Sequence, residues 1–136
     1  MPKQSLTPTY VPPLFMGVGA GAPIFETKTA SFTVTEADSG KIFLVYGATA
    51  AVTVTLPAVG SVFQCTVVNL SDVDLTVASV VADTLVTYND LTADSVAFST
   101  SSEKIGGSVW CFGNGTIIGA LARISSSYQN VTIATA

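Results

Sequence analysis

Residues 52–70 read VTVTLPAVGSVFQCTVVNL, and this stretch decides the fold class. Valine and threonine alternate in the first run, Pro57 stops it, and Gly60 precedes a second run of strand-forming residues. Strict alternation places apolar side chains on one face of a strand and polar side chains on the other. Pro57 cannot donate to a strand ladder and Gly60 permits a tight corner, so the stretch predicts two β-strands joined by a short turn.

Similar runs, separated by turn residues, recur along the chain. They cover residues 29–35, 41–46, 52–56, 62–70, 75–79, 84–88, 96–99, 108–112 and 116–122. Such spacing is typical of an all-β domain, so we predict a jelly-roll-like sandwich or barrel of about eight to nine antiparallel strands. No window shows helical periodicity.

Four local patterns make finer predictions. In the run 62–70, Phe63, Cys65 and Val67 share the face expected to point inward, and in the run 29–35 Ala30, Phe32 and Val34 share one face. The run 41–46 is almost continuously apolar, which predicts a strand covered on both faces. The pair Asn114-Gly115 predicts a tight hairpin with positive φ at both positions. The Trp110 side chain is expected to be buried as the largest one of the core.

Residues 1–28 are expected to form an extended arm ahead of a β-domain over residues 29–122. Their prolines remove backbone donors and fix φ, and their glycines add flexibility. The arm also carries large apolar side chains that lose free energy in water, which makes them candidate partner-binding residues. These are Tyr10, Val11, Leu14, Phe15, Met16, Ile24 and Phe25. A second chain is the simplest surface to cover them, and the arm folded over its own barrel is the alternative.

Residues 123–136 form a C-terminal tail that could add an edge strand. The candidate contact residues there are Tyr128, Val131 and Ile133. An unpaired strand gains most by pairing with an exposed sheet edge, in its own chain or in a neighbour.

The 136 residues fit one domain, and only 10% of them are charged, with a mean hydropathy of +0.58. A monomer with so few charges would be poorly soluble unless partners or Ser and Thr covered its surface. The net charge is −4 and the cations are scattered singly, which disfavours nucleic-acid and anionic-membrane partners. The prolines and glycines of residues 1–22 argue against a signal peptide, so synthesis is expected in the cytoplasm of a host cell.

No catalytic, cofactor-binding or metal-binding residue is predicted. The chain has no histidine, the commonest general acid–base, and its carboxylates lie in turns. The pair Asp72 and Asp74 offers too few oxygens for calcium by itself. Cys65 and Cys111 are interpreted as buried thiols, with a disulfide left open, and they cannot complete a zinc site without histidine.

One part of the chain resembles a pattern of tailed-phage virion proteins. Its marks are the segments 54–58, Gly60, 67–69, 83–86, 107–110 and 113–116. The chain looks like the jelly-roll decoration, or cement, proteins of phage heads, and also like β-rich modules of tail fibres. The resemblance implies a homotrimer without an active site that sits on the major capsid protein at the outside of the virion and reinforces the shell.

Two functions therefore remain open. The first is capsid decoration through the arm, since a tail-fibre module would not obviously need so long an apolar arm. The alternative is a tail-fibre or lectin-like module that recognises host glycans, for which Tyr46, Tyr88 and Asp90 are the clustered candidates.

Overall fold

The structure is a computed structural model that describes residues 23–124 and 129–135. Eleven strands and one short 3-10 helix make up this part of the chain. They are β1 (Ile24–Lys28), β2 (Phe32–Thr33), η1 (Glu36–Asp38), β3 (Lys41–Val45), β4 (Val52–Thr55), β5 (Val62–Asn69), β6 (Leu75–Ala78), β7 (Leu85–Thr87), β8 (Asp90–Phe98), β9 (Ser108–Asn114), β10 (Ile118–Arg123) and β11 (Thr132–Thr135). The predicted all-β class is confirmed.

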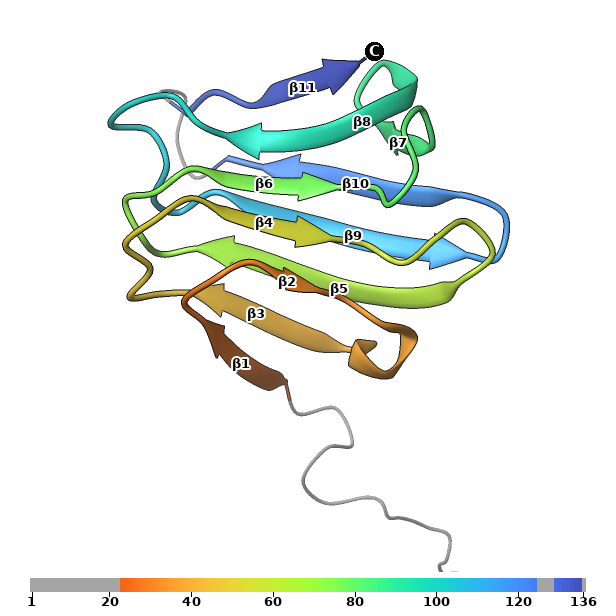
Figure 1. Ribbon diagram of the computed structural model, residues 1–136, viewed down its shortest axis with the longest axis horizontal. Helices are drawn as coiled ribbons and strands as arrows, with labels where there is room; N and C mark the ends of the chain where they lie inside the picture. The colour runs from red at the N-terminus through yellow and green to blue at the C-terminus, as the bar shows by residue number, and fades with distance from the viewer. Residues whose placement is uncertain (1–22, 125–128, 136) are drawn as a thin grey trace, which may run out of the picture.

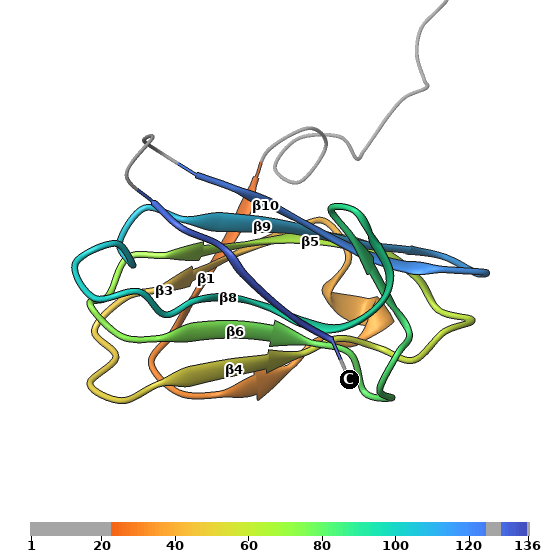
Figure 2. The same cartoon turned by 90° about the horizontal axis from the view of Figure 1, so that it is seen from above.

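The strands form one sheet that bends over on itself into two layers. Its order is β1-β3-β5-β9-β10-β7-β8-β6-β4-β2, and β11 adds to β8. Figure 2 shows β5, β9 and β10 in one layer and β4 and β6 in the other. Figure 1 shows β1 and β11 at opposite ends of the stack. The two ends of the order, β1 and β2, are not paired with each other among the described residues, so the barrel stays open along this seam.

The expectation that the strands are antiparallel is wrong for half of the pairings. Five of the ten pairings between described strands are parallel: β1 with β3, β3 with β5, β2 with β4, β4 with β6, and β7 with β10. The first six strands alternate between the two layers as the chain winds. A chain that crosses to the other layer and returns runs in its original direction, so successive strands within a layer are parallel. Alternation in sequence sets the face of a strand but not its partner.

The core lies between the layers and is built from the inward face of each strand. Phe63, Cys65 and Val67 are buried on β5, as predicted, and Val34 is buried as well. Phe43 and Phe98 are the largest side chains that are fully buried. Trp110 is not in the core.

The expectation for Trp110 is wrong because its two neighbours on β9 point into the core, so its own side chain must point outward. Val109 and Cys111 are fully buried, so the side chain between them points outward, and Trp110 is 37% exposed. Alternation along the strand outweighs the free energy that burying one large ring would gain.

The β9–β10 hairpin is present, but its turn differs from the prediction. Asn114 is the last residue of β9, and only Gly115 has a positive φ, of 93°. The Oδ1 atom of Asn114 accepts hydrogen bonds from the backbone N–H groups of Thr116 and Ile117, at 2.9 and 3.0 Å. This side-chain cap organises a longer loop, so the two-residue turn is not needed.

Candidate functional site

The outer face of the layer β1-β3-β5-β9-β10 is unusually apolar. Cross-strand neighbours form rows on it, because residues paired between adjacent strands point to the same side. The central row is Phe25, Ile42, Thr66, Trp110 and Leu121, and the next row is Thr27, Leu44, Val68, Ser108 and Arg123. All ten side chains are half-buried or exposed. The prediction that the strand 41–46 is covered on both faces is not met by the described residues, since Ile42 and Leu44 stay half-buried.

The outer face of the opposite layer has a different composition. Its two rows are Thr53, Thr76, Ala97 and Thr132, and Thr33, Thr55, Ala78, Ser95 and Ala134. Small and hydroxyl-bearing side chains suit a surface in water, and they supply the Ser and Thr covering that the low charge requires. The two outer faces therefore differ in polarity, and the outer face of the β1–β10 layer is the one whose exposure to water is unfavourable. Large contiguous apolar patches of this kind mark interaction sites.

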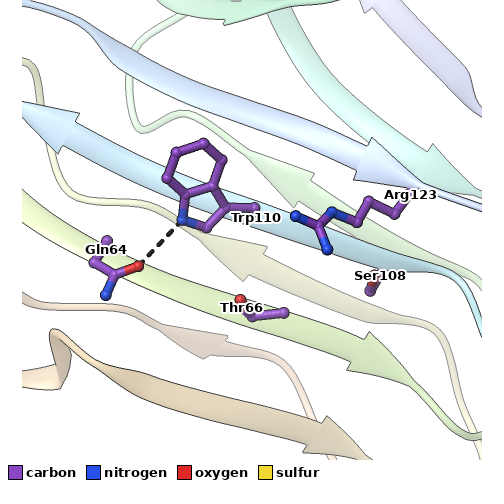
Figure 3. Close-up of a pocket in the computed structure, with 5 residues that line it drawn as sticks. All are labelled: Gln64, Thr66, Ser108, Trp110 and Arg123. Carbon is purple, nitrogen blue, oxygen red and sulfur yellow. Dashed lines mark hydrogen bonds between the residues drawn. The ribbon is translucent and has the colours of Figure 1, made fainter. Parts of the chain in front are cut away.

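A shallow pocket of about 270 Å³ lies in the apolar outer face. Its lining residues are Gln64, Thr66, Ser108, Trp110 and Arg123, from β5, β9 and β10 (Figure 3). The indole Nε1–H of Trp110 donates a hydrogen bond of 3.2 Å to the Oε1 atom of Gln64. Figure 3 shows the Arg123 side chain extending toward the indole. The pocket thus combines an aromatic ring with polar groups that converge on one space.

Phe112 and Gly119 support the indole from one side. The ring centroids of Trp110 and Phe112 lie 4.6 Å apart, with the rings tilted by 35°. Phe112 pairs across the hairpin with Gly119, and a Cβ atom at Gly119 would overlap the Phe112 ring. The bare backbone of Gly119 therefore lets the ring lie over β10, where it holds Trp110 in place.

The charges near the β1 edge are paired within the chain. Lys41 lies 2.8 Å from both Glu26 and Asp38, and Lys28 lies 2.6 Å from Glu26. Hydrogen bonds from these lysines lower the pKa of Glu26, and the hydrogen bond from Lys41 is the main cause of the lowered pKa of Asp38. The same contacts, first with Asp38 and then with Glu26, raise the pKa of Lys41 above its ordinary value. This cluster ties β1 to β3 and η1.

The predicted contact residues fall partly within the described chain. Ile24 and Phe25 lie on β1 and are 49% and 59% exposed. Phe25 belongs to the apolar outer face, whereas Ile24, which pairs with Lys41, belongs to the opposite side of the strand. Val131 and Ile133 are half-buried and pack against the core, Ile133 from β11, which pairs with β8 of its own chain. Six other predicted residues lie outside the described residues: Tyr10, Val11, Leu14, Phe15, Met16 and Tyr128.

The structure does not gather the glycan-binding candidates of the sequence. Three strands, β5, β9 and β10, separate β3, which Tyr46 follows, from β7, which Tyr88 follows. The Tyr88 hydroxyl donates a 2.6 Å hydrogen bond to the backbone oxygen of Ala122. Asp90 accepts a 2.9 Å hydrogen bond from the backbone N–H of Thr92.

Sequence reasoning missed the Trp110 pocket, although the alternation of residues 108–112 contained the signal.

The two cysteines face each other in the core. Cys65 on β5 pairs in register with Cys111 on β9, and both are buried and unoxidised. The hydrogen bond with Cys65, followed by burial, raises the pKa of the Cys111 thiol. A thiol of this kind stays protonated and is a poor nucleophile.

Acidic side chains do not converge in the part of the chain that the structure describes. Across residues 23–124 and 129–135, no group of three His, Cys, Asp or Glu side chains could hold a metal ion. Asp74, one of the two acids weighed for calcium, lies 2.6 Å from Lys104.

Comparisons with known proteins add no family to this description: no family model matches the chain, and no curated protein is significantly similar to it. Along the described residues, none of the helical structure is both long and apolar enough to cross a bilayer.

Proposed function

We propose that this chain is a structural virion protein, a capsid decoration protein that forms a homotrimer on the major capsid protein and stabilises the phage head from outside. The observation that supports it most is the apolar outer face of β1-β3-β5-β9-β10, which borders the arm. Phe25 lies on that face, so the chain that precedes it starts at the edge of the surface that needs covering. The arm and the face together form one contact surface for a shell.

The binding free energy would come from the burial of apolar area. An arm that removes ~500 Å² of apolar surface from water contributes on the order of 12 kcal/mol before association and ordering costs. Three arms on one trimer act together through their effective concentration, so the trimer binds more tightly than one arm.

The experiment compares the full chain with a variant that lacks residues 1–22, which keeps β1 complete. Both proteins are mixed with decoration-free capsids of tailed phages and sedimented, and analytical ultracentrifugation measures their mass in solution. We expect the full chain to co-sediment and to show three times the 13.9 kDa chain mass, while the truncated chain stays folded in the supernatant. Unchanged occupancy of the truncated chain on the capsids would contradict the role of the arm.

A glycan-binding module is the second candidate, and the Trp110 pocket favours it. An indole offers a stacking surface to the apolar face of a sugar ring, and Gln64 and Arg123 lie beside it as donors. A glycan array probed with the wild type and with Trp110→Ala tests this function directly. Binding that disappears in the variant would support it over capsid decoration.

A further inference from the structure

The polar groups that line the Trp110 pocket can all donate hydrogen bonds to an occupant. Gln64 uses its Oε1 atom to accept from the indole, so its amide N–H groups remain free to donate. The hydroxyls of Thr66 and Ser108 have no hydrogen-bond partner among the described residues. No carboxylate lines the pocket. Arg123 and the amide N–H groups of Gln64 can only donate, and the two hydroxyls can donate or accept. Together they suit an occupant that supplies acceptor oxygens.

Arg123 adds an unpaired positive charge to this site. The described chain contains four cationic side chains, and Lys28, Lys41 and Lys104 each lie within 2.8 Å of a carboxylate. Arg123 has no carboxylate within 4.0 Å among the described residues. A guanidinium pairs bidentately with the oxygens of a carboxylate or a phosphate, so Arg123 is free to receive an anion of either kind.

The residues around the pocket indicate which groups must flank the anion of the occupant. Phe25, Ile42 and Leu121 share the central row with Trp110, and Phe112 lies beside it. A small hydrated anion would leave these side chains exposed to water. An occupant that covers them must place apolar groups on both sides of its carboxylate. Trp and Arg are the residue types on which protein interfaces concentrate their binding energy, and here they lie side by side next to apolar neighbours.

The arm does not have a free carboxylate to supply. Residues 1–22 contain no Asp or Glu, and Glu26, the one acid of the arm, is paired with Lys28 and Lys41 of its own chain. The anion therefore comes from a different part of a partner.

We infer that the Trp110 pocket receives an aspartate or glutamate side chain of a partner protein, flanked by apolar residues that cover the central row. Arg123 pairs with the carboxylate, Gln64 and Ser108 donate to it, and the indole packs against its methylene groups. This inference rests on the proposed function, because a shell subunit is the partner that would present the acid.

The experiment uses the full chain and two short peptides, acetyl-Leu-Glu-Leu-amide and acetyl-Leu-Gln-Leu-amide. Trp110 is the only tryptophan, so its indole N–H signal in a ¹H–¹⁵N spectrum reports the pocket without ambiguity. We expect the Glu peptide to shift this signal with an affinity about 3- to 10-fold higher than the Gln peptide. The difference should shrink when salt is raised, since the pocket is open to solvent.

Variants separate Arg123 from general charge. Arg123→Gln should abolish the preference for the Glu peptide, whereas Lys104→Gln, which removes the same charge elsewhere, should keep it. Equal affinities for the two peptides in the wild type would overturn the inference. Acetate that shifts the signal as tightly as the Glu peptide would reduce the site to a simple anion site, and tighter binding of glucuronate would assign it to a saccharide. Either result overturns the inference.

The titration also separates the two proposals. It needs neither a capsid nor a trimer, so a chain that fails to bind capsids but prefers the Glu peptide would refute only the capsid role. A chain that binds capsids without that preference would refute only the pocket.

Discussion

At the scale of single residues, Thr87 on β7 stands out. Its Oγ1 atom is the only buried side-chain nitrogen or oxygen without a hydrogen-bond partner in residues 23–124 and 129–135. A buried hydroxyl that leaves water without gaining a partner lowers the stability of the fold. Valine has nearly the same shape and no polar atom to desolvate.

We expect Thr87→Val to raise the free energy of unfolding by about 1 kcal/mol, because it removes an unsatisfied hydroxyl. Urea denaturation followed by circular dichroism measures the change. Thr53→Val, at an exposed threonine of β4, is the control and should stay within about 0.5 kcal/mol of the wild type. A destabilised Thr87→Val variant would show that the hydroxyl has a partner after all.

Trp110 shows what the sequence could predict at this scale and what it could not. Its outward direction follows from the phase of β9, which the buried Val109 and Cys111 fix. The expectation of a core position came from the size of the ring, and size does not override alternation. The contacts with Gln64 and Arg123 depend on how β5, β9 and β10 are placed side by side, which no local pattern reveals.

At the scale of elements, the ion pairs of β1 and β3 make stability depend on pH. The pKa values of Glu26 and Asp38 are lowered in the folded chain. Each carboxylate therefore contributes stability above its unfolded pKa, about 4.3 for Glu and about 3.9 for Asp, and loses it as the pH falls through the folded value. Lys41 is the residue that both carboxylates share.

We expect the free energy of unfolding to fall as the pH drops from 5.5 to 2, and to fall less steeply in Lys41→Met. The methionine keeps the apolar stem of the lysine and removes the ammonium group that both carboxylates share. Lys28 still pairs with Glu26 and the Thr35 backbone N–H still donates to Asp38, so the slope becomes shallower without vanishing. Urea titrations at several pH values measure the two slopes. In Glu26→Gln the slope of the free energy of unfolding against pH should lie between those of the wild type and Lys41→Met. Identical slopes in the wild type and Lys41→Met would refute the explanation.

The β5–β9 pair makes a second prediction, about its facing cysteines. Cys65 and Cys111 are buried in register, and the pKa of the Cys111 thiol is raised. We expect a thiol reagent such as DTNB to label neither cysteine in the native chain and both in urea, because both thiols are buried and out of reach of the reagent. Rapid labelling of the native protein would mean that this strand pair opens readily.

Strand positions were largely predictable from sequence, whereas strand partners were not. The run predicted at residues 62–70 is β5 (Val62–Asn69), and the run predicted at 75–79 is β6 (Leu75–Ala78). Alternation and turn residues act locally, so they mark where a strand begins and ends. The winding between layers that makes β3 and β5 parallel depends on contacts distant in sequence.

At the scale of the whole molecule, the contrast between the two outer faces predicts unequal effects of the same change. Leu44 and Thr76 are half-buried residues at comparable positions on opposite outer faces. A charge at Leu44 would enter the apolar contact surface, whereas a charge at Thr76 would face water.

We expect Leu44→Glu to weaken the affinity for capsids, or the association of the chains with one another, at least about 10-fold, because a buried unpaired charge costs several kcal/mol at an interface. The loss would be seen as lower capsid occupancy or as a lower mass in solution. Thr76→Glu should leave both measurements unchanged. Co-sedimentation and analytical ultracentrifugation make the comparison, with circular dichroism to show that both variants fold. An equal loss in the two variants would mean that the apolar outer face is not the contact surface.

The parallel pairing of β1 with β3 determines how the arm would transmit force. The arm joins the domain at β1, and five residue pairs connect β1 to β3 in register. A pull on the arm along the strand axis loads all of these connections in shear, so they must yield together and cannot be peeled apart one at a time. Glu26 and Lys41 add an ionic link across the same pair. This attachment is mechanically suited to a tether that is pulled along the axis of β1.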